Sequence, residues 1–299
     1  MKSYGWIISR LGLLALIWGS SFILMKRGLF NEAGEAIFSG FEVGFLRICF
    51  AGMALAPFAV KGLKNVQRKE WFPLIIAGVV GNGMPAILFA TAQTQINSSL
   101  AGVLNSLTPF FTLILGVAIF GVSAGLKKYL GVILGLVGAC GLILSQSNFQ
   151  FDISSVGGYS LLVVLACVGY ATSVNVIKTY LQNLRPLYIT SISFLLMLPF
   201  FIIAAIFSDI PQVILANPDA GPALGYIAVL GVIGTAMAVV IFNHVIRETS
   251  ALTASSVTYL IPIVAVAWGI IDGEKFSWMD LLFAAIIISG VYLVRTKKT

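Results

Sequence analysis

Long apolar runs and short polar segments alternate along the whole chain. A helix that crosses a bilayer needs roughly 20 mostly apolar residues, because each residue adds about 1.5 Å of length. Runs of about that length recur from one end of the sequence to the other. The pattern predicts an all-α polytopic membrane protein with ten transmembrane helices. The predicted spans are residues 10–28, 41–60, 72–92, 98–120, 128–146, 157–179, 187–208, 222–245, 251–271 and 278–295.

Two of the predicted spans are interrupted near their middles by polar residues and a proline. The fourth contains NSLTPF, starting at Asn105, and the ninth contains TYLIPI, starting at Thr258. Each proline lacks a backbone N–H and frees the carbonyl four residues earlier. A freed carbonyl is costly in hydrocarbon unless it lines a water-filled cavity or a neighbouring helix satisfies it. The pattern therefore favours either a shared central cavity or two packing kinks. For the cavity, the candidate residues are Asn105, Thr108, Pro109, Thr258, Tyr259 and Pro262.

The two interruptions belong to an internal repeat. A shift of 153 positions superposes identical residues in the third and fourth spans on the eighth and ninth. The matching residues of the first copy are Gly78, Val79, Gly81, Met84, Phe89, Ala101, Leu107, Pro109 and Gly116. A shift of 152 aligns Trp18, Ser21 and Lys26 with Tyr170, Ser173 and Lys178. These matches indicate a duplication.

The number of predicted spans makes this repeat an inverted one. Five spans precede the segment 147–156 and five follow it, and because five is odd the second copy enters the membrane from the opposite side. We therefore expect two inverted five-helix halves, residues 1–146 and 157–299, joined by an extracytoplasmic loop at 147–156. In transporters with such repeats, the substrate site lies near the midplane of the bilayer, where the halves meet.

Charged residues predict the orientation of the chain. If the N-terminus is cytoplasmic, 14 of the 18 Lys and Arg residues fall in cytoplasmic segments. Such an excess is what the positive-inside rule describes. We therefore expect a bacterial-type inner (plasma) membrane protein with both termini in the cytoplasm. The 14 residues are Lys2, Arg10, Lys61, Lys64, Arg68, Lys69, Lys127, Lys128, Lys178, Arg185, Arg247, Arg295, Lys297 and Lys298.

Composition agrees with a membrane location and narrows the partners. Hydrophobic residues make up 59% of the chain and charged residues 10%, with a mean hydropathy of +1.01, which is too apolar for a soluble domain. Basic loops beside anionic lipid explain the net charge of +7, so we expect a lipid bilayer and no nucleic acid as partner. Three cysteines lie in apolar runs without metal-like spacing, so we expect no disulfide, metal or cofactor. The oligomeric state stays open, and a monomer is compatible with the sequence.

Further candidates lie at mid-depth in other spans. Trp18 and Tyr170 fall near the centres of spans one and six, rather than at the interfaces where aromatic anchors gather, and Ser21 lies one turn after Trp18. Asn82 in span three and Thr235 in span eight supply hydrogen-bonding groups at the same depth, beside small residues that let helices approach or slide. A close-packed interface explains these glycines as well as a gate or hinge does. The glycines are Gly81, Gly83 and Gly234.

Three charged residues fall inside predicted spans or at their outer ends. Arg47 lies about a third of the way into span two, and Lys26 and Glu42 are at comparable or shallower depth. An unpaired charge in the membrane is costly, so Arg47 needs a carboxylate, a carbonyl or water as partner. Arg47 and Lys26 are either groups that bind an anionic part of a substrate or snorkelling and salt-bridged side chains.

The sequence resembles the EamA-type transporters of the drug/metabolite transporter superfamily. The resemblance rests on "LIWGSSFILMKRG", on "FATAQTQINSSLAGVLNSLTPFFTLILGVAIFG" and on "ETSALTASSVTYLIPIVAVAWGIIDGEKFSWMDLLFAAIIISGVYLV", and it covers essentially the whole chain. It implies ten helices in two inverted halves around a central cavity, and the movement, often outward, of small organic solutes such as amino acids or drugs. The family pattern matches Trp18, Gly19, Ser20, Ser21, Lys26, Arg47, Pro109, Pro262, Gly273 and Glu274. The first half departs from it, because Gly121-Val122 stands where a Gly-Glu pair would be expected.

We therefore expect a secondary carrier that exports a small metabolite, such as an amino acid, by alternating access. The alternative within transport is a multidrug or amine exporter, which needs an accessible carboxylate in the cavity. Glu42 is the one candidate for that role, and it lies at a shallow depth. An intramembrane enzyme is disfavoured because no HExxH, GxSxG or paired aspartate-rich motif is present. A purely structural membrane protein would not explain the paired interruptions at mid-depth.

Overall fold

The computed structural model describes residues 4–96, 98–146, 158–264 and 277–294. In these ranges the regular elements are helices, and no strand is present. The predicted loop at 147–156, and Gly273 with Glu274, lie outside the described residues.

Six helical segments are long and apolar enough to cross a membrane, which confirms a multi-pass membrane protein. They are residues Gly5–Leu29, Gly40–Leu63, Arg68–Ala92, Gly158–Tyr180, Pro186–Ile206 and Ala220–Glu248. Each coincides with a predicted span, although the first helix begins at Tyr4, six residues before the predicted start. The fourth and ninth predicted spans coincide with interrupted helical segments, and the fifth and tenth with the helices Leu126–Gln146 and Trp278–Val294.

The elements in chain order are α1 (Tyr4–Leu29), α2 (Gly40–Leu63), η1 (Arg68–Glu70), α3 (Trp71–Gly78), η2 (Val79–Gly83), α4 (Met84–Ala92), α5 (Ser98–Asn105), α6 (Thr108–Ala118), α7 (Leu126–Gln146), α8 (Gly158–Tyr180), α9 (Pro186–Ile206), α10 (Ile210–Ala216), α11 (Ala220–Gly231), η4 (Val232–Met237), α12 (Ala238–Glu248), α13 (Ala251–Ser255), η5 (Ser256–Tyr259) and α15 (Trp278–Val294).

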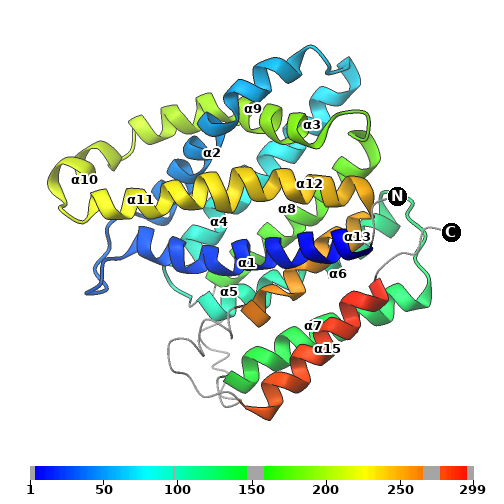
Figure 1. Cartoon of the computed structure of the whole chain (residues 1–299). Coiled ribbons are helices and arrows are strands. Elements are labelled where there is room, and N and C mark those ends of the chain that lie inside the picture. The colour runs from blue at the N-terminus through cyan, green and yellow to red at the C-terminus, as the bar shows by residue number, and fades with distance from the viewer. Residues whose placement is uncertain (1–3, 97, 147–157, 265–276, 295–299) are drawn as a thin grey trace.

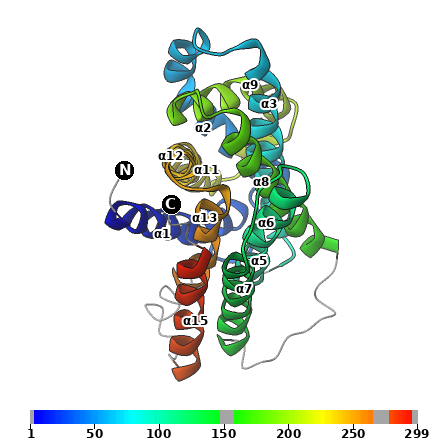
Figure 2. The ribbon, with the colours of Figure 1, turned by 90° about the vertical axis from the view of Figure 1, so that its right-hand side faces the viewer.

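The helices form three groups, a central one and one on either side of it. Helices α2, α3 and α9 lie on one side, α7 and α15 on the opposite side, and α1, α4, α8, α11 and α12 between them (Figure 1 and Figure 2). Helices α7 and α15 pack closely, since a Cβ added at Gly131 would lie 2.8 Å from the Gly290 carbonyl oxygen. Small residues permit such an approach of two backbones.

Two long segments of the bundle contain a π-helical turn. Elements α3, η2 and α4 form one continuous segment, and α11, η4 and α12 form the other. In the first, the Asn82 side chain donates to the Ala77 carbonyl at 2.7 Å; in the second, the Thr235 hydroxyl donates to the Leu230 carbonyl at 3.0 Å. Each bond reaches back five residues, and the two bonds are 153 positions apart. π-helical turns are rare and often mark functional sites.

Contacts between the two halves of the sequence are reciprocal. Gly81 of η2 lies against Ser173 of α8, so closely that a Cβ at position 81 would collide with the serine hydroxyl. Gly234 of η4 lies in the same way against Ser21 of α1, where an added Cβ would be 2.9 Å from the hydroxyl oxygen. Gly81 and Ser21 belong to the first half of the sequence, and their partners Ser173 and Gly234 belong to the second half. The two glycines are 153 positions apart and the two serines 152.

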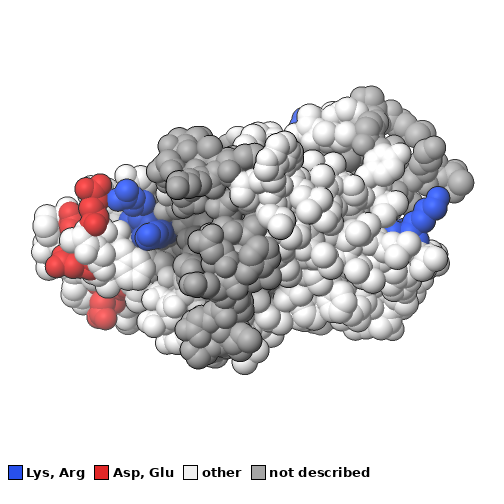
Figure 3. Space-filling model, turned by 90° about the horizontal axis from the view of Figure 1, so that it is seen from below, with Lys and Arg blue, Asp and Glu red and all other residues white. Residues whose placement is uncertain are grey.

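Charged residues gather at the two ends of the bundle. On the face seen in Figure 3, acidic side chains lie at one end together with a small basic group, other basic side chains lie toward the opposite end, and most of the described surface between them is uncharged. Large apolar side chains are exposed over the helices, among them Phe200 at 72% and Phe207 at 86%. The N-terminal end of α1 and the C-terminal end of α15 lie at the same end of the bundle (Figure 1).

Candidate functional site

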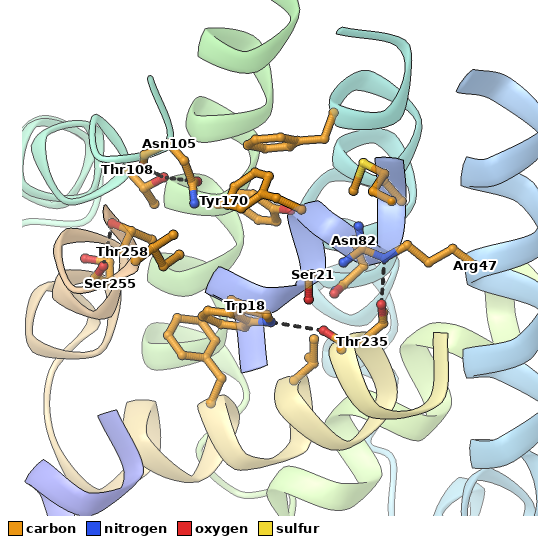
Figure 4. A pocket seen from close by; sticks show the side chains of 18 of the residues that line it. Trp18, Ser21, Arg47, Asn82, Asn105, Thr108, Tyr170, Thr235, Ser255 and Thr258 are labelled. Carbon is orange, nitrogen blue, oxygen red and sulfur yellow. Dashed lines mark hydrogen bonds between the residues drawn. The ribbon is translucent and has the colours of Figure 1, made fainter. Parts of the chain in front are cut away.

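A cavity lies within the bundle, lined by side chains from both halves of the sequence. The space between its atoms, with its open part included, is about 800 Å³. Figure 4 shows most of its walls. The lining residues are Trp18, Ser21, Phe22, Met25, Arg47, Asn82, Ala86, Phe89, Asn105, Thr108, Tyr170, Val174, Gly234, Thr235, Val239, Phe242, Ser255, Thr258 and Ile261.

Most lining residues form pairs that are 152 or 153 positions apart. Trp18 and Tyr170, for example, occupy matching places on α1 and α8. The other pairs are Phe22 with Val174, Asn82 with Thr235, Ala86 with Val239, Phe89 with Phe242, Asn105 with Thr258, and Thr108 with Ile261. Both halves of the sequence therefore contribute to the cavity lining at positions with nearly the same spacing.

Polar groups gather at two separate ends of the cavity. Figure 4 shows Arg47, Asn82, Ser21 and Thr235 at one end and Asn105, Thr108, Ser255 and Thr258 at the other, with Trp18 and Tyr170 between them. Such an arrangement of apolar walls with a few polar groups is typical of a site for a small organic molecule.

Aromatic rings form the walls between the two ends. Trp18 meets Phe242 edge to face, with ring centroids 5.1 Å apart. Phe89 lies between Phe22, at 6.4 Å, and Tyr170, at 6.0 Å. The Trp18 indole N–H donates to the Gly234 carbonyl at 3.0 Å (Figure 4). Buried Trp N–H groups usually find such a partner, and here it fixes the plane of the ring.

The chain is broken between α5 and α6, as the NSLTPF pattern predicts. Helix α5 ends at Asn105 and α6 begins at Thr108, with Pro109 in its first turn. The Asn105 carbonyl accepts a hydrogen bond from the Thr108 hydroxyl at 2.8 Å (Figure 4). The carbonyl that the proline frees is therefore satisfied within the break. Pro109 is buried and is not one of the lining residues.

The second break follows α13, as the TYLIPI pattern predicts. Here η5 replaces the α-helix up to Tyr259, and α-helical turns resume at residues 261–264. The Thr258 carbonyl lies 3.5 Å from the Ser106 hydroxyl, the outer limit of a hydrogen bond, so the two breaks face each other. Pro262 is buried and lies outside the lining.

Tyr259 points away from the cavity although its neighbour Thr258 lines it. Its side chain has no exposed surface, and its hydroxyl donates to the Val132 carbonyl of α7 at 3.0 Å. A Cβ added at Gly135 would lie 2.5 Å from the Tyr259 ring. The structure therefore places Tyr259 in the packing of α7 rather than in the cavity.

Arg47 reaches the cavity from α2. Its Nε donates to the Thr235 hydroxyl at 2.6 Å (Figure 4), and this hydroxyl in turn donates to the Leu230 carbonyl. Arg47 is partly exposed, and it lines the cavity. The sequence left open whether this arginine binds an anion or serves the structure; its position beside the cavity makes the first role possible.

The remaining charged candidates lie outside the cavity lining. Lys26 is exposed in the last turn of α1, and Lys178, which stands 152 positions later, donates to the Ile246 carbonyl at 2.9 Å near the end of α12. Glu42 is buried at the start of α2, where it forms a capping box with Ser39: its carboxylate accepts from the Ser39 amide at 2.7 Å. This pairing satisfies helix N-terminal donors and gives Glu42 a local structural role.

Two of the glycine candidates lie behind the cavity rather than in its lining. Gly81 packs against Ser173, and a Cβ at Gly83 would lie 2.8 Å from the Met197 sulfur. Gly234 is the one of the three that lines the cavity.

Several lining residues were not among the sequence candidates, although signals for some were present. Phe22 and Met25 share a helix face with Trp18, at spacings of four and seven residues. Phe242 follows Phe89 by 153 positions. Ser255 lies three residues before Thr258. Thr235, which the sequence indicates as a hydrogen-bonding group at mid-depth, also lies in the lining.

The chain is similar to known membrane transporters along its whole length. The model of the EamA-like transporter family matches residues 6–144 and again residues 158–296. An uncharacterized transporter from Archaeoglobus fulgidus is 22% identical over 98% of this chain and 99% of the relative. The uncharacterized inner membrane transporter YedA from Escherichia coli strain K12 is 25% identical over 95% of this chain and 89% of the relative.

Two further similarities extend the range of relatives. The chloroplastic WAT1-related protein At3g02690 from Arabidopsis thaliana is 25% identical over 93% of this chain and 66% of the relative. A solved crystal structure, 15% identical in sequence, superposes with a TM-score of 0.71 over 97% of this chain and 96% of that one. At this identity the agreement shows a shared fold.

Proposed function

The chain belongs to the EamA-like transporter family, and from this premise we propose that it is a secondary carrier that moves a small metabolite by alternating access through the central cavity. Its ten helices form two inverted five-helix halves, residues 1–146 and 157–299, joined by an extracytoplasmic segment at 147–156. The family makes this protein a membrane transporter rather than an enzyme; the mechanism, the cargo and the direction are the proposal.

The observation that carries the proposal is the composition of the cavity wall. Seven pairs of lining residues stand 152 or 153 positions apart, so the cavity lies where the proposed halves meet. Carriers built from inverted repeats hold their substrate at this place and rock one half against the other around it. The reciprocal contacts of Gly81 with Ser173 and of Gly234 with Ser21 support the same arrangement.

Two irregular features give the halves a means to move. The π-helical turns η2 and η4 and the breaks at 106–107 and 256–260 interrupt four segments beside the cavity. Side-chain bonds satisfy carbonyls at these points. Non-helical backbone in a membrane is tolerated where protein buries it or where it borders a cavity, so these segments can bend without exposing polar groups to lipid.

The distribution of charges supports the proposed orientation and location. The excess of Lys and Arg at the predicted cytoplasmic ends supports termini in the cytoplasm of a bacterial-type inner (plasma) membrane. The ends of α1 and α15 at one end of the bundle (Figure 1) agree with an even number of crossings. The lipid bilayer and a small-molecule substrate are the proposed partners, and the direction is outward.

An amino acid or a similar amphipathic metabolite is the proposed cargo. Trp18, Tyr170 and the neighbouring phenylalanines offer apolar walls, and amides and hydroxyls lie at both ends of the cavity. The alternative, an amine or drug exporter, needs a carboxylate in the cavity. Among the described lining residues there is none, and Glu42 caps α2 instead.

Counterflow in proteoliposomes tests the proposed mechanism. Vesicles are loaded with pools of unlabelled amino acids, and uptake of a labelled trace from outside is measured. An alternating-access carrier should give saturable, transient accumulation that depends on the internal pool. Direction is then tested in everted membrane vesicles, where an exporter should accumulate the cargo.

Replacing two different alanines by tryptophan supplies the control. Ala86 lines the cavity, and Ala54 is exposed on the outside of α2. Ala86→Trp should abolish counterflow by filling the cavity, while Ala54→Trp should retain it. Equal counterflow in both variants would contradict passage through this cavity. If folded wild-type protein gives no counterflow with any of the amino-acid pools, the carrier mechanism is contradicted for these solutes.

A further inference from the structure

Arg47 gives the lining of the cavity a positive charge. It is the one charged side chain among the lining residues that the structure describes. A charge in the membrane interior requires a polar or charged partner. The partner that Arg47 has is neutral, the Thr235 hydroxyl at 2.6 Å. In the described part of the chain, the recorded ion pair is the exposed one between Arg27 and Glu32, so no carboxylate from these residues neutralises Arg47.

The hydrogen bond to Thr235 leaves the outer part of the guanidinium available. A guanidinium has five N–H donors in a planar fork, and Nε uses one of them. The two terminal amino groups present the edge that binds a carboxylate with two parallel hydrogen bonds. Arg47 is partly exposed and lines the cavity, so this edge can be reached by a molecule inside it.

The charge also breaks the symmetry of the cavity wall. Most lining residues have a lining counterpart 152 or 153 positions away. The corresponding positions for Arg47 are Pro199 and Phe200, both exposed on α9. A molecule in the cavity therefore meets a positive group at one end and neutral amides and hydroxyls at the other (Figure 4).

We propose that Arg47 binds the carboxylate of the transported molecule, and that the cargo is a small monocarboxylate whose apolar or aromatic body lies between Trp18 and Tyr170. This inference rests on the proposed carrier function and gives it a chemical class. A carboxylate at this position supplies the counter-charge that the described cavity lacks. Amines without a carboxylate are excluded, because they would place a second positive charge beside Arg47 in a site of low dielectric.

Matched pairs of compounds separate the carboxylate from the rest of the molecule. Phenylalanine, tryptophan and leucine are compared with 2-phenylethylamine, tryptamine and 3-methylbutylamine, which lack only the carboxyl group. 3-Phenylpropionate keeps the carboxylate and lacks the amine. Each compound competes against labelled phenylalanine or another exchanged cargo from the amino-acid pools in wild-type proteoliposomes. The carboxylates should compete and the amines should not.

Substitutions at Arg47 then assign the selectivity to this side chain. Arg47→Gln should weaken competition by the carboxylates tenfold or more, because it removes a charge-assisted pair of hydrogen bonds. Arg47→Lys should retain part of it as a point charge without the fork. The control is Lys61→Gln, which neutralises an exposed basic residue in the last turn of the same helix and should leave competition unchanged. Thermal unfolding of each purified variant verifies that it folds.

The outcomes distinguish this inference from the function on which it rests. If wild-type protein exchanges a cargo but the amines compete as well as their parent amino acids, the carboxylate assignment is wrong and the carrier stands. The same holds if a folded Arg47→Gln variant keeps wild-type competition. If Arg47→Gln does not fold, the inference is tested by the Arg47→Lys variant and by comparing the amino acids with their amines in wild-type protein. If wild-type protein exchanges none of the tested compounds, neither the carboxylates nor the amines, the carrier function and the inference are overturned together.

Discussion

The indole N–H of Trp18 donates a hydrogen bond to the carbonyl of Gly234 at 3.0 Å and so ties α1 to the π-helical turn of η4. The bond joins the two halves of the sequence at the wall of the cavity. Gly234 also lies against Ser21, one turn beyond Trp18 on α1. One helix face therefore both lines the cavity and holds the irregular turn opposite it.

Trp18→Phe should loosen this connection while keeping an aromatic wall. The variant removes the indole N–H, and a polar contact between membrane helices contributes about 0.6 kcal/mol on average. We expect a small decrease in the thermal unfolding midpoint of purified protein and a larger change in the rate of counterflow, because the bond restrains η4. An unchanged rate in a folded variant would show that this bond has no part in the transport cycle.

The two reciprocal glycine contacts should respond differently to a methyl group. A Cβ at position 81 would collide with both the hydroxyl and the Cβ of Ser173, whereas a Cβ at position 234 would approach the Ser21 hydroxyl at 2.9 Å and its Cβ at 3.9 Å. Overpacking typically costs about 1–3 kcal/mol. Gly81→Ala should therefore destabilise the protein more than Gly234→Ala in thermal unfolding.

Second-site changes at the serines provide the control. Ser21→Ala should restore stability to Gly234→Ala, because it removes the hydroxyl that the methyl group meets. Ser173→Ala should not restore Gly81→Ala, since the serine Cβ remains, but Ser173→Gly should. If Ser173→Ala were as effective as Ser173→Gly, the contact would be looser than the structure shows.

Pro109→Ala tests whether the break before α6 serves transport. The alanine N–H could donate to the Asn105 carbonyl, now held by the Thr108 hydroxyl, and continue the helix. Transport should decrease while the unfolding midpoint is kept or rises. The control is Pro199→Ala, which changes an exposed proline inside α9, outside the cavity lining. A loss of folding in Pro109→Ala equal to its loss of transport would instead favour a packing kink.

Two tyrosine-to-phenylalanine changes should separate packing from substrate contact. Tyr259→Phe loses a buried hydrogen bond to the Val132 carbonyl, which typically contributes about 0.5–1.5 kcal/mol, so stability should fall and substrate affinity should not. Tyr170→Phe removes a hydroxyl from a residue that lines the cavity, so affinity should fall with little effect on stability. Thermal unfolding and counterflow competition measure the two properties. The reverse pattern would contradict the positions of both residues.

Sequence and structure agree best where the signal is local. Pro109 and Pro262 predict their breaks because proline has no N–H to donate, and both breaks are present. The partner of the freed Asn105 carbonyl is also local, because Thr108 is three residues away. The partner of the Thr258 carbonyl was beyond a local argument, because Ser106 is 152 residues away in the chain. The role of Glu42 was also locally readable, because Ser39 stands three residues before it in the capping-box pattern.

By itself, the sequence determined the class of the protein, most helix positions and the two breaks, because these depend on apolar length and backbone chemistry. Only the tertiary structure decided which side chains face the cavity. Membrane helices are apolar on nearly every side, so hydrophobicity does not mark their inner face. Thr258 and Tyr259 are neighbours, yet one lines the cavity and the other packs against α7, because the direction of a side chain depends on the local helix turn and on the helix opposite.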